Sequence, residues 1–357
     1  AREHRNKGNI VLKGYNPTIL LDSAPHIQSF GGKEVLSLRY IAEEILKEGL
    51  GYRYDFKVEP RYINNLTYTC QYNETHFNYL ARLAASFGEQ FYYDGERVQF
   101  GRLLITEEPI SLTFGKDVEE IDIQMQAKHV NRELFGYNSS NDEILNSVST
   151  KVNHSSSLAK DAYKISERTF TTASLQIAPM KAINSQDVEA AQQSATESEG
   201  ISVLVVSGKT SIPFLYPGCT VNMNVVDADT KKVDYMTKLI ITDIEHSLDI
   251  VGNYVGYFKA VGAEADCLPN PYFSTPVVSE QIATVIDNKD PMNQGRVKVH
   301  FAWQTGITSS EWIRVMTPDA GGTDKIKQNR GYVAIPEIGD QVMVGFTNGH
   351  PDRPYVM

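Results

Sequence analysis

Apolar side chains recur with the period of a helix in two stretches of the first hundred residues. In the first stretch, the spacing i, i+3, i+4, i+7 places four apolar residues on one helical face. Gly49 follows them and is expected to end this helix. The four residues of the face are Leu38, Ile41, Ala42 and Ile45.

The second stretch carries signals for both of its ends. Asn73 is a residue type that is favoured at an N-cap, and Glu74 would place a carboxylate beside the positive end of the helix dipole. Gly88 is expected at the C-terminal cap. The predicted apolar face between these ends consists of Phe77, Leu80, Ala84 and Phe87.

Most of the remaining apolar pattern indicates strands. Val221, Met223 and Val225 alternate with polar residues, which is typical of a strand with one buried face. Asp94-Gly95 between two apolar runs predicts a hairpin turn. Near the C-terminus, Gly and Pro separate five short segments, which predicts a small closed barrel of the OB type. These segments are Gln281–Ile286, Arg296–Phe301, Trp312–Met316, Tyr332–Ile335 and Gln341–Phe346.

Changes in composition divide the chain into regions. Residues 266–276 contain three prolines and form the clearest linker. Residues 138–200 are dense in Ser, Thr and Asn. Within them, residues 185–199 have a helical pattern that Gly200 should end, but little apolar surface, so we expect a helix that packs loosely on the outside. The whole pattern predicts a mostly β, α+β fold.

Composition and charge exclude several classes of function. The 357 residues predict two or three domains. The chain has 34 basic and 44 acidic residues, a net charge of −10, which argues against a general binder of nucleic acid or of anionic membranes. No apolar run approaches the ~18 residues of a membrane span, so a stable membrane anchor is not expected.

The three cysteines, Cys70, Cys219 and Cys267, have no spacing that is typical of a disulfide framework or a zinc site. We expect them to be buried, free thiols in a protein that folds in a reducing cytoplasm. The chain begins without Met and ends at Met357 in a strand-like pattern, which suggests a fragment of a longer protein. Its first residues carry no signal-peptide core.

Motifs near the C-terminus resemble a known family. In order, they are Gly295–Trp303 (GRVKVHFAW), Glu311–Val315 (EWIRV), Ile335–Phe346 (IPEIGDQVMVGF) and Asn348–Pro354 (NGHPDRP). They are similar to the OB domain of the VgrG (valine–glycine repeat) spike proteins of type VI secretion systems, which are related to contractile phage tail proteins. Upstream, Lys13–Asp22 (KGYNPTILLD), Gln71–Phe77 (QYNETHF) and Leu80–Leu83 (LARL) resemble the hub of the same family. The chain departs from the family at His350, where an acidic residue is usual, and at Glu337, where a basic one is frequent.

The resemblance implies a phage-hub-like double β-barrel with an inserted α/β unit, followed by an OB-fold barrel. The changes in pattern described above, assigned to the parts that the resemblance implies, give the expected boundaries. A first hub barrel would include residues 1–25 and 101–112, and the inserted α/β domain would be residues 26–100. A second hub barrel would be residues 113–265, with the polar insertion 138–200. A linker of residues 266–276 would lead to the OB domain of residues 277–357.

The function that the resemblance implies is mechanical. Such a spike is a homotrimer that caps a hexameric tube protein, contacts baseplate proteins, carries a spike-tip protein and effectors, and helps to puncture a target envelope. It would be cytoplasmic during assembly and then exported through the contractile apparatus. Two alternatives stay open: the hub of a phage tail or extracellular injection particle, and a tail-associated cell-wall hydrolase.

Candidate chemistry is sparse. The eight histidines are dispersed and none lies at zinc-site spacing, and no Gly-x-Ser-x-Gly elbow is present. We therefore expect no enzyme activity, catalytic residue, cofactor or metal. Residues 277–357 carry eight basic and nine acidic side chains, so the OB segment is not expected to bind single-stranded nucleic acid. We interpret the residues of the motifs as structural, with Arg353 pairing locally. They are Asn73, Glu74, Phe77, Gly295, Trp303, Trp312, Pro336, Gly339, Pro351, Asp352, Arg353 and Pro354.

Overall fold

The computed structural model describes residues 2–4, 9–104, 108–147, 150–154, 156–227, 229–263, 267–306, 308–317 and 332–357. The fold is mostly β, with 39% strand and 19% helix, which confirms the predicted class. The chain forms two compact units, each made of segments that are distant in sequence. Unit 1 contains Ala1–Leu21, Leu46–Arg61 and Leu83–Tyr272, and unit 2 contains Asp22–Ile45, Tyr62–Arg82 and Phe273–Met357.

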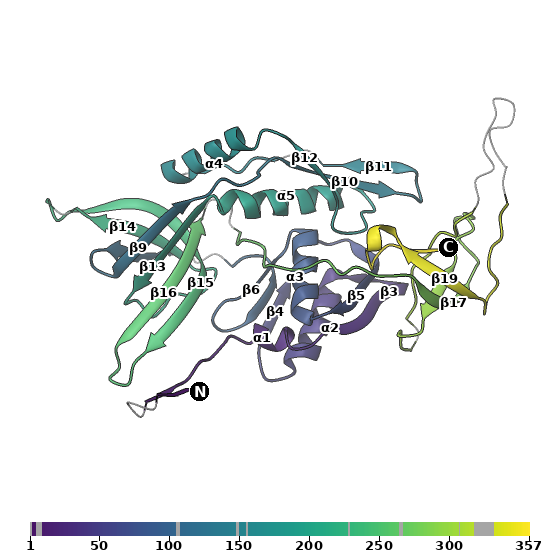
Figure 1. Ribbon diagram of the computed structural model, residues 1–357, viewed down its shortest axis with the longest axis horizontal. Helices are drawn as coiled ribbons and strands as arrows, with labels where there is room; N and C mark the ends of the chain where they lie inside the picture. Colours follow the sequence, from purple (N-terminus) through teal and green to yellow (C-terminus); the bar gives the residue numbers. More distant parts are fainter. Residues whose placement is uncertain are drawn as a thin grey trace. The chain divides into compact units, whose positions relative to one another are not determined.

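Unit 1 contains a closed six-stranded barrel (Figure 1). Alternate residues of each strand face the barrel interior, and Val221, Met223 and Phe258 are at most 1% exposed there. The predicted alternation is confirmed at Val221 and Met223, whereas Val225 is only half-buried. In spatial order the strands are β13 (Leu204–Thr210), β16 (Tyr254–Gly262), β15 (Val233–Leu248), β14 (Thr220–Val226), β8 (Ile110–Phe114) and β9 (Val118–Met125).

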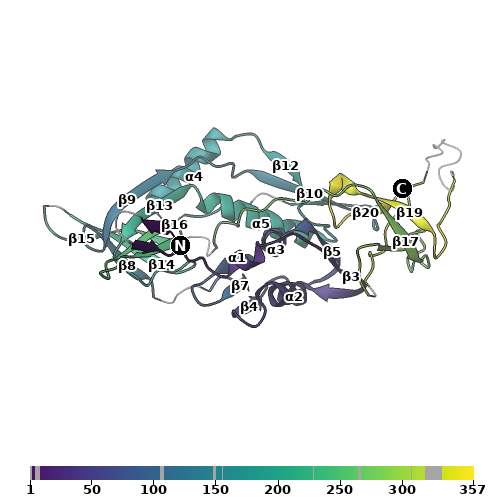
Figure 2. The same cartoon turned by 60° about the horizontal axis from the view of Figure 1, so that its bottom comes forward.

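A three-stranded sheet and two helices follow in unit 1 (Figures 1 and 2). In this sheet β10 (Arg132–Asn138) pairs antiparallel with β11 (Glu143–Asn146) and parallel with β12 (Ser174–Ile177). The helices are α4 (Ser157–Thr169), which the sequence pattern does not predict, and α5 (Ser185–Ile201). Helix α5 covers one face of the sheet closely, because a Cβ atom on Gly136 would lie 3.2 Å from Val188 Cγ2.

The prediction that α5 packs loosely is wrong. Asn184 caps it through a capping box with Asp187, and Gly200 lies inside the helix. Gln192 is fully buried, and its amide nitrogen donates to the Thr196 hydroxyl at 3.0 Å. Hydrogen bonds of this kind let a polar helix enter the interior, and apolar periodicity does not detect them.

The rest of unit 1 consists of small elements. β6 and β7 form the predicted hairpin, and Gly95 in its turn has φ of +95°. The apolar run 19–21 lies in a one-turn helix. The elements are β1 (Arg2–His4), β2 (Asn9–Val11), α1 (Thr18–Leu21), β4 (Phe56–Glu59), β6 (Gln90–Tyr93) and β7 (Val98–Gly101).

The two predicted helices exist, with corrected ends. α2 (Leu38–Leu50) buries its predicted apolar face completely, but it continues past Gly49. Its last residue is Leu50, and Gly51 caps it with φ of +62° and donates its N–H to Lys47 O. α3 (His76–Phe87) ends at Gly88 as predicted, with φ of +73°.

The start of α3 differs from the prediction. Thr75 is the N-cap, because its hydroxyl accepts the N–H of Asn78 at 3.1 Å. Asn73 instead has a left-handed φ of +49°, and Glu74 is the last residue of strand β5 rather than part of the first helical turn. Leu80, Ala84 and Phe87 are buried as predicted, whereas Phe77 is half-buried.

Unit 2 contains two sheets. β3 (His26–Ser37) pairs antiparallel with β5 (Asn65–Glu74). The C-terminal sheet has the order β18 (Lys298–Phe301), β17 (Gln281–Asp287), β19 (Gln341–Phe346) and β20 (Pro354–Val356), and the 3₁₀ turn Thr347–Gly349 links its last two strands.

The strands expected after residue 276 are present in part. Val297, Val299 and Phe301 are fully buried on one face, as predicted for a barrel wall. The segment 312–316 contributes only isolated bridges, from Ile313 and Val315. Residues 332–335 form no strand, and Ile335 is 45% exposed, so the predicted strand there is wrong.

Candidate functional site

A fully buried guanidinium marks the most unusual polar site in unit 2. Arg82 lies on α3, is 1% exposed and is the largest fully buried side chain among the described residues. Burying a charge without partners costs several kcal/mol, so this cation requires partners with good geometry. Its position on a helix that is buried from Tyr79 to Phe87 keeps those partners out of water.

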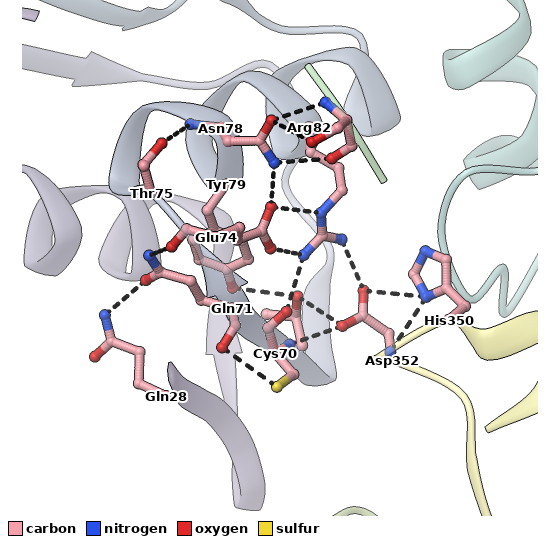
Figure 3. A network of polar contacts seen from close by, with 12 residues as sticks. Gln28, Cys70, Gln71, Glu74, Thr75, Asn78, Tyr79, Arg82, His350 and Asp352 are labelled. Atoms are coloured by element: carbon pink, nitrogen blue, oxygen red, sulfur yellow. Dashed lines mark hydrogen bonds and ion pairs between the residues drawn. The ribbon is translucent and has the colours of Figure 1, made fainter. Parts of the chain in front are cut away.

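Two carboxylates from distant parts of the chain supply these partners (Figure 3). Glu74 Oε1 accepts from Arg82 Nη2 at 2.7 Å, and Asp352 Oδ2 accepts from Nη1 at 3.5 Å. Nη2 also donates to the carbonyl of Cys70 at 2.8 Å. The side chains of Glu74 and Asp352 are 4% and 6% exposed, so all three charges are buried together.

Asp352 also satisfies the backbone of β5. Its Oδ1 accepts the N–H of Cys70 at 2.7 Å and the hydroxyl of Thr69 at 3.3 Å. Its own N–H donates to His350 Nδ1 at 3.2 Å. One carboxylate in the loop after the 3₁₀ turn therefore binds both a strand edge and a helical cation.

Glu74 holds the other side of the guanidinium through a tight turn. The left-handed Asn73 turns the chain so that Glu74 faces back toward α3, where its Oε2 also accepts from Asn78. Asn78 Oδ1 accepts the N–H of Ser274 at 2.8 Å. Helix α3 is thus fixed both to its preceding strand and to the chain that enters the C-terminal sheet.

Arg82, Glu74 and Asp352 are the ionic groups that meet in this cluster. Burial would lower the pKa of Arg82, but attraction by Asp352 and Glu74 outweighs that cost and raises the pKa above its ordinary value. Burial raises the pKa of the Cys70 thiol and the Tyr79 hydroxyl well above their ordinary values, so both stay neutral. A protonated, buried thiol is a poor nucleophile.

Further contacts within unit 2 join the β3–β5 pair to the C-terminal segment. Gln304 Nε2 donates to Ser29 Oγ at 2.7 Å, and Thr67 Oγ1 donates to Glu311 Oε2 at 2.8 Å. Gly32 has φ of +82°, and a Cβ atom there would lie 2.0 Å from the carbonyl oxygen of Ser309. This close approach excludes every side chain larger than hydrogen at Gly32.

A second buried ion pair shapes the loop between β17 and β18. Asp290 Oδ1 accepts from Arg296 Nη2 at 2.7 Å, and its Oδ2 accepts from Arg296 Nε at 3.0 Å. The same carboxylate accepts the backbone N–H groups of Met292 and Gln294. Gly295 completes this loop with φ of +69°. Hydrogen bonds from Arg296 hold the pKa of Asp290 well below its ordinary value.

The residues interpreted as structural lie in several parts of unit 2. Asp352 and Glu74 meet at Arg82, and Pro351, Arg353 and Pro354 share the loop of Asp352. Burial lowers the pKa of Arg353, which the charge of Asp352 partly offsets.

The other motif residues lie elsewhere. Trp303 stacks on Phe301 and donates to Gln281 at 2.8 Å, and Trp312 lies beneath the ammonium of Lys298. Gly339 has φ of +99°, and Pro336 O accepts from Asn288. The local pairing expected for Arg353 and the structural role expected for these residues stay predictions.

Sequence analysis did not single out Arg82. It occurs in the quoted motif LARL, and the available signal was a cation in the middle of an otherwise apolar helical run. Cys70 and Lys298 were also missed as contact residues; Lys298 Nζ donates to the carbonyl of Gly32 at 2.6 Å. The three cysteines are buried and free, as predicted. No group of three or more potential metal ligands occurs among the residues that the structure describes.

Comparison with known proteins agrees with this geometry. Residues 281–357 match the family model of the type VI secretion system/phage-baseplate injector OB domain. The chain is 38% identical over 110 residues to the type VI secretion system spike protein VgrG1c of Pseudomonas aeruginosa, covering 26% of this chain and 14% of that protein. It is 34% identical over 111 residues to VgrG3 of Vibrio cholerae, covering 29% of this chain and 10% of that protein.

The whole fold has a solved counterpart. The E. coli c3393 protein, described as a component of the type VI secretion system similar to the T4 bacteriophage tail proteins gp27 and gp5, superposes with a TM-score of 0.56. The match covers 95% of this chain and 75% of that chain, at 17% identity. The chain resembles the VgrG spike proteins. The predicted resemblance is therefore confirmed, and the matched part spans only 10–14% of the length of the curated relatives above.

The curated relatives matched above are type VI secretion system spike proteins, and the fold is shared with the solved c3393 protein. None of the described helices is long and apolar enough to cross a membrane. Within unit 2, the buried network joins the end of β5 and helix α3 to the loop that precedes β20.

Substituting Asp352 by Ala should destabilise the VgrG-like chain by about 3–5 kcal/mol, because it leaves Arg82 short of a buried partner and Cys70 N–H without an acceptor. Urea denaturation measures the change. Glu280→Ala, an exposed acidic site in the same segment, is the matched control and should change stability by no more than about 0.5 kcal/mol. Equal effects of the two substitutions would contradict the assignment.

The Asp290–Arg296 pair predicts that the folded state loses stability at acidic pH. A carboxyl whose folded pKa is depressed stabilises the fold above its unfolded pKa of about 3.9, and that contribution disappears as the pH falls toward the folded pKa. The stability difference between the wild type and Asp290→Asn should therefore be constant from pH 7 to 5 and shrink below about pH 4. Denaturant titrations at pH 7 and pH 3 measure it, and a difference that stays constant down to pH 3 would refute the pairing.

Proposed function

We propose that the VgrG-like chain is the hub and OB portion of a homotrimeric spike in a contractile injection machine. In this proposal it caps a hexameric tube protein, contacts baseplate proteins, and supports a spike tip and effectors during puncture of a target envelope. The observation that carries the proposal is the buried joint between α3 and the OB segment. The family match and the tail-hub fold support it.

The joint suits a part that transmits force. A surface ion pair contributes little to stability and is weakened by salt, whereas a buried pair exchanges its partners only at a large desolvation cost. Arg82, Glu74 and Asp352 lie on different segments, so these segments cannot separate within unit 2 without exposing or orphaning a charge. The rigidity of this joint allows a load on the OB segment to reach α3.

The same network argues against a hydrolytic role for the described chain. Hydrolysis of a sugar polymer normally needs one carboxyl with a raised pKa and a second carboxylate across an open cleft. Glu74 and Asp352 both face Arg82 in a closed interior, which leaves neither available to a substrate. We therefore propose a non-enzymatic part without a cofactor. A cell-wall hydrolase would need a different, exposed pair of acidic residues.

Two kinds of machine fit the proposal. We favour a type VI secretion system, because the curated relatives are spike proteins of that system. In that case the chain assembles in the cytoplasm and leaves through the contractile apparatus. A phage tail or an extracellular particle is the alternative, and neighbouring genes for a membrane-anchoring complex or for a capsid would distinguish them.

The proposal is tested by deleting the gene in the source bacterium and restoring it in two forms. Loss of the gene should abolish assembled tubes and sheaths in sedimented lysates, and the wild-type gene should restore them. Asp352→Ala should restore them poorly, while Glu280→Ala should restore them fully. Normal assembly in the deletion strain, with loss only of wall-degrading activity, would favour the hydrolase instead.

The full-length protein should be a trimer. A trimer of chains that each supply two similar barrels presents six barrels to a hexameric tube. Multi-angle light scattering of the complete gene product should give three times the chain mass over a broad concentration range. A monomeric mass at every concentration would contradict the proposed spike.

A further inference from the structure

The three-stranded sheet of unit 1 has one covered and one bare face. Helix α5 packs on the face that carries Leu134, Gly136 and Leu145, where Leu134 and Leu145 are at most 4% exposed. A sheet in a layered fold normally buries apolar side chains on both faces or carries polar residues on the exposed one. Apart from Glu133 and Asn146, the strand register places apolar side chains on the opposite face, and most of them are exposed.

Strand register places five apolar side chains on that bare face. Tyr137 is paired with Ile144 across β10 and β11, and Phe135 is paired with Ile177 across β10 and β12. Leu175 lies two residues before Ile177 and therefore on the same side. Tyr137, Ile144, Leu175 and Ile177 are 50%, 63%, 67% and 52% exposed. Phe135 is half-buried between them.

These side chains form one continuous patch, which we call the bare sheet face: Phe135, Tyr137, Ile144, Leu175 and Ile177. Exposed single apolar residues are normal on a protein surface, whereas contiguous patches larger than a few hundred Å² are rare on monomers and mark interaction sites. Helix α5 already packs on the opposite face of this sheet, so a second helix could pack on the bare sheet face in the same way.

The charges beside the patch define the partner further. Glu133 lies on the same face as Leu175, at one end of β10, and it forms no ion pair among the described residues. Asp142 lies in the turn at the other end, where it accepts from the Tyr137 hydroxyl. The strand register places no Lys, Arg or His on this face. The patch is therefore apolar, with Asn146 beside Phe135 and a carboxylate at each end.

We propose that the bare sheet face docks an amphipathic helix of another protein, with an apolar stripe against the sheet and Lys or Arg on its flanks. The apolar stripe would bury the five side chains, and the basic flanks would meet Glu133 and Asp142. That this partner travels as cargo of the spike rests on the proposed function, whereas the docking itself does not.

The first test uses a labelled synthetic helix of 18 residues with Leu on one face and Lys on the other. Fluorescence anisotropy should show binding to the purified chain, and Ile177→Ser should weaken it at least tenfold. Leu248→Ser is the matched control, since Leu248 is 70% exposed on a hairpin of the same unit, and it should leave binding unchanged. Glu133→Gln should weaken binding about two- to fivefold, as expected for an exposed ion pair.

A peptide with Glu in place of Lys supplies the charge control and should bind at least tenfold more weakly. Equal binding by the two peptides, or equal loss in Ile177→Ser and Leu248→Ser, would overturn the proposal. Because these measurements use purified protein, their failure is distinguishable from failure of the machine to assemble. Circular dichroism melts confirm that each variant is folded.

A second test identifies the occupant in cells. A photo-crosslinking amino acid replaces Tyr137 in the full-length protein in the source bacterium, and mass spectrometry locates the crosslinked peptide. The expected product is a segment of another protein with apolar residues at helical spacing and flanking Lys or Arg. Crosslinks to a second copy of this chain, or to no protein, would overturn the proposal.

Discussion

The buried guanidinium of Arg82 is the constraint on which the arrangement of unit 2 depends. A charge that is 1% exposed must be neutralised locally, and no single neighbouring segment does this. Glu74 arrives from the end of β5 and Asp352 from the loop before β20. The chain must therefore bring residues 270 positions apart into contact before the helix can bury its cation. This requirement selects one register of the C-terminal loop against α3, which a purely apolar contact would not do.

Close backbone approach reinforces the same register. Gly32 has no room for a Cβ atom against Ser309, and Gly31 has none against Thr67. Both have positive φ, so the bulge in β3 and the passage of the OB segment beside it need the same two glycines. A polar network fixes which groups meet, and the glycines fix how closely the backbones lie. The polar network alone would allow small shifts between the segments, because hydrogen bonds tolerate them. The close packing at the two glycines does not allow such shifts.

The sequence predicts elements better than it predicts their polar contacts. Periodic apolar residues placed α2 and α3 correctly, and alternation predicted the walls at Val221 and Val299, since both signals follow directly from burial of one face. The predicted helix ends were wrong where the backbone conformation sets the cap. Thr75, and not Asn73, is the N-cap of α3, because Asn73 adopts a left-handed conformation. Residues 332–335 have strand-like composition but no strand partner. The Arg82 network could not be predicted, because its partners are distant in sequence and only folding shows that Glu74 and Asp352 meet.

Two buried polar systems in this chain show why low apolar content does not mean loose packing. Helix α5 buries Gln192 by pairing its amide with Thr196 and with Ser147. Helix α3 buries Arg82 by pairing it with two carboxylates and a carbonyl. In both cases directional bonds satisfy groups that burial would otherwise penalise. The bare sheet face has the opposite character, since four of its five apolar side chains are at least half exposed. The proposed amphipathic helix would bury these side chains, which the described fold leaves exposed to water.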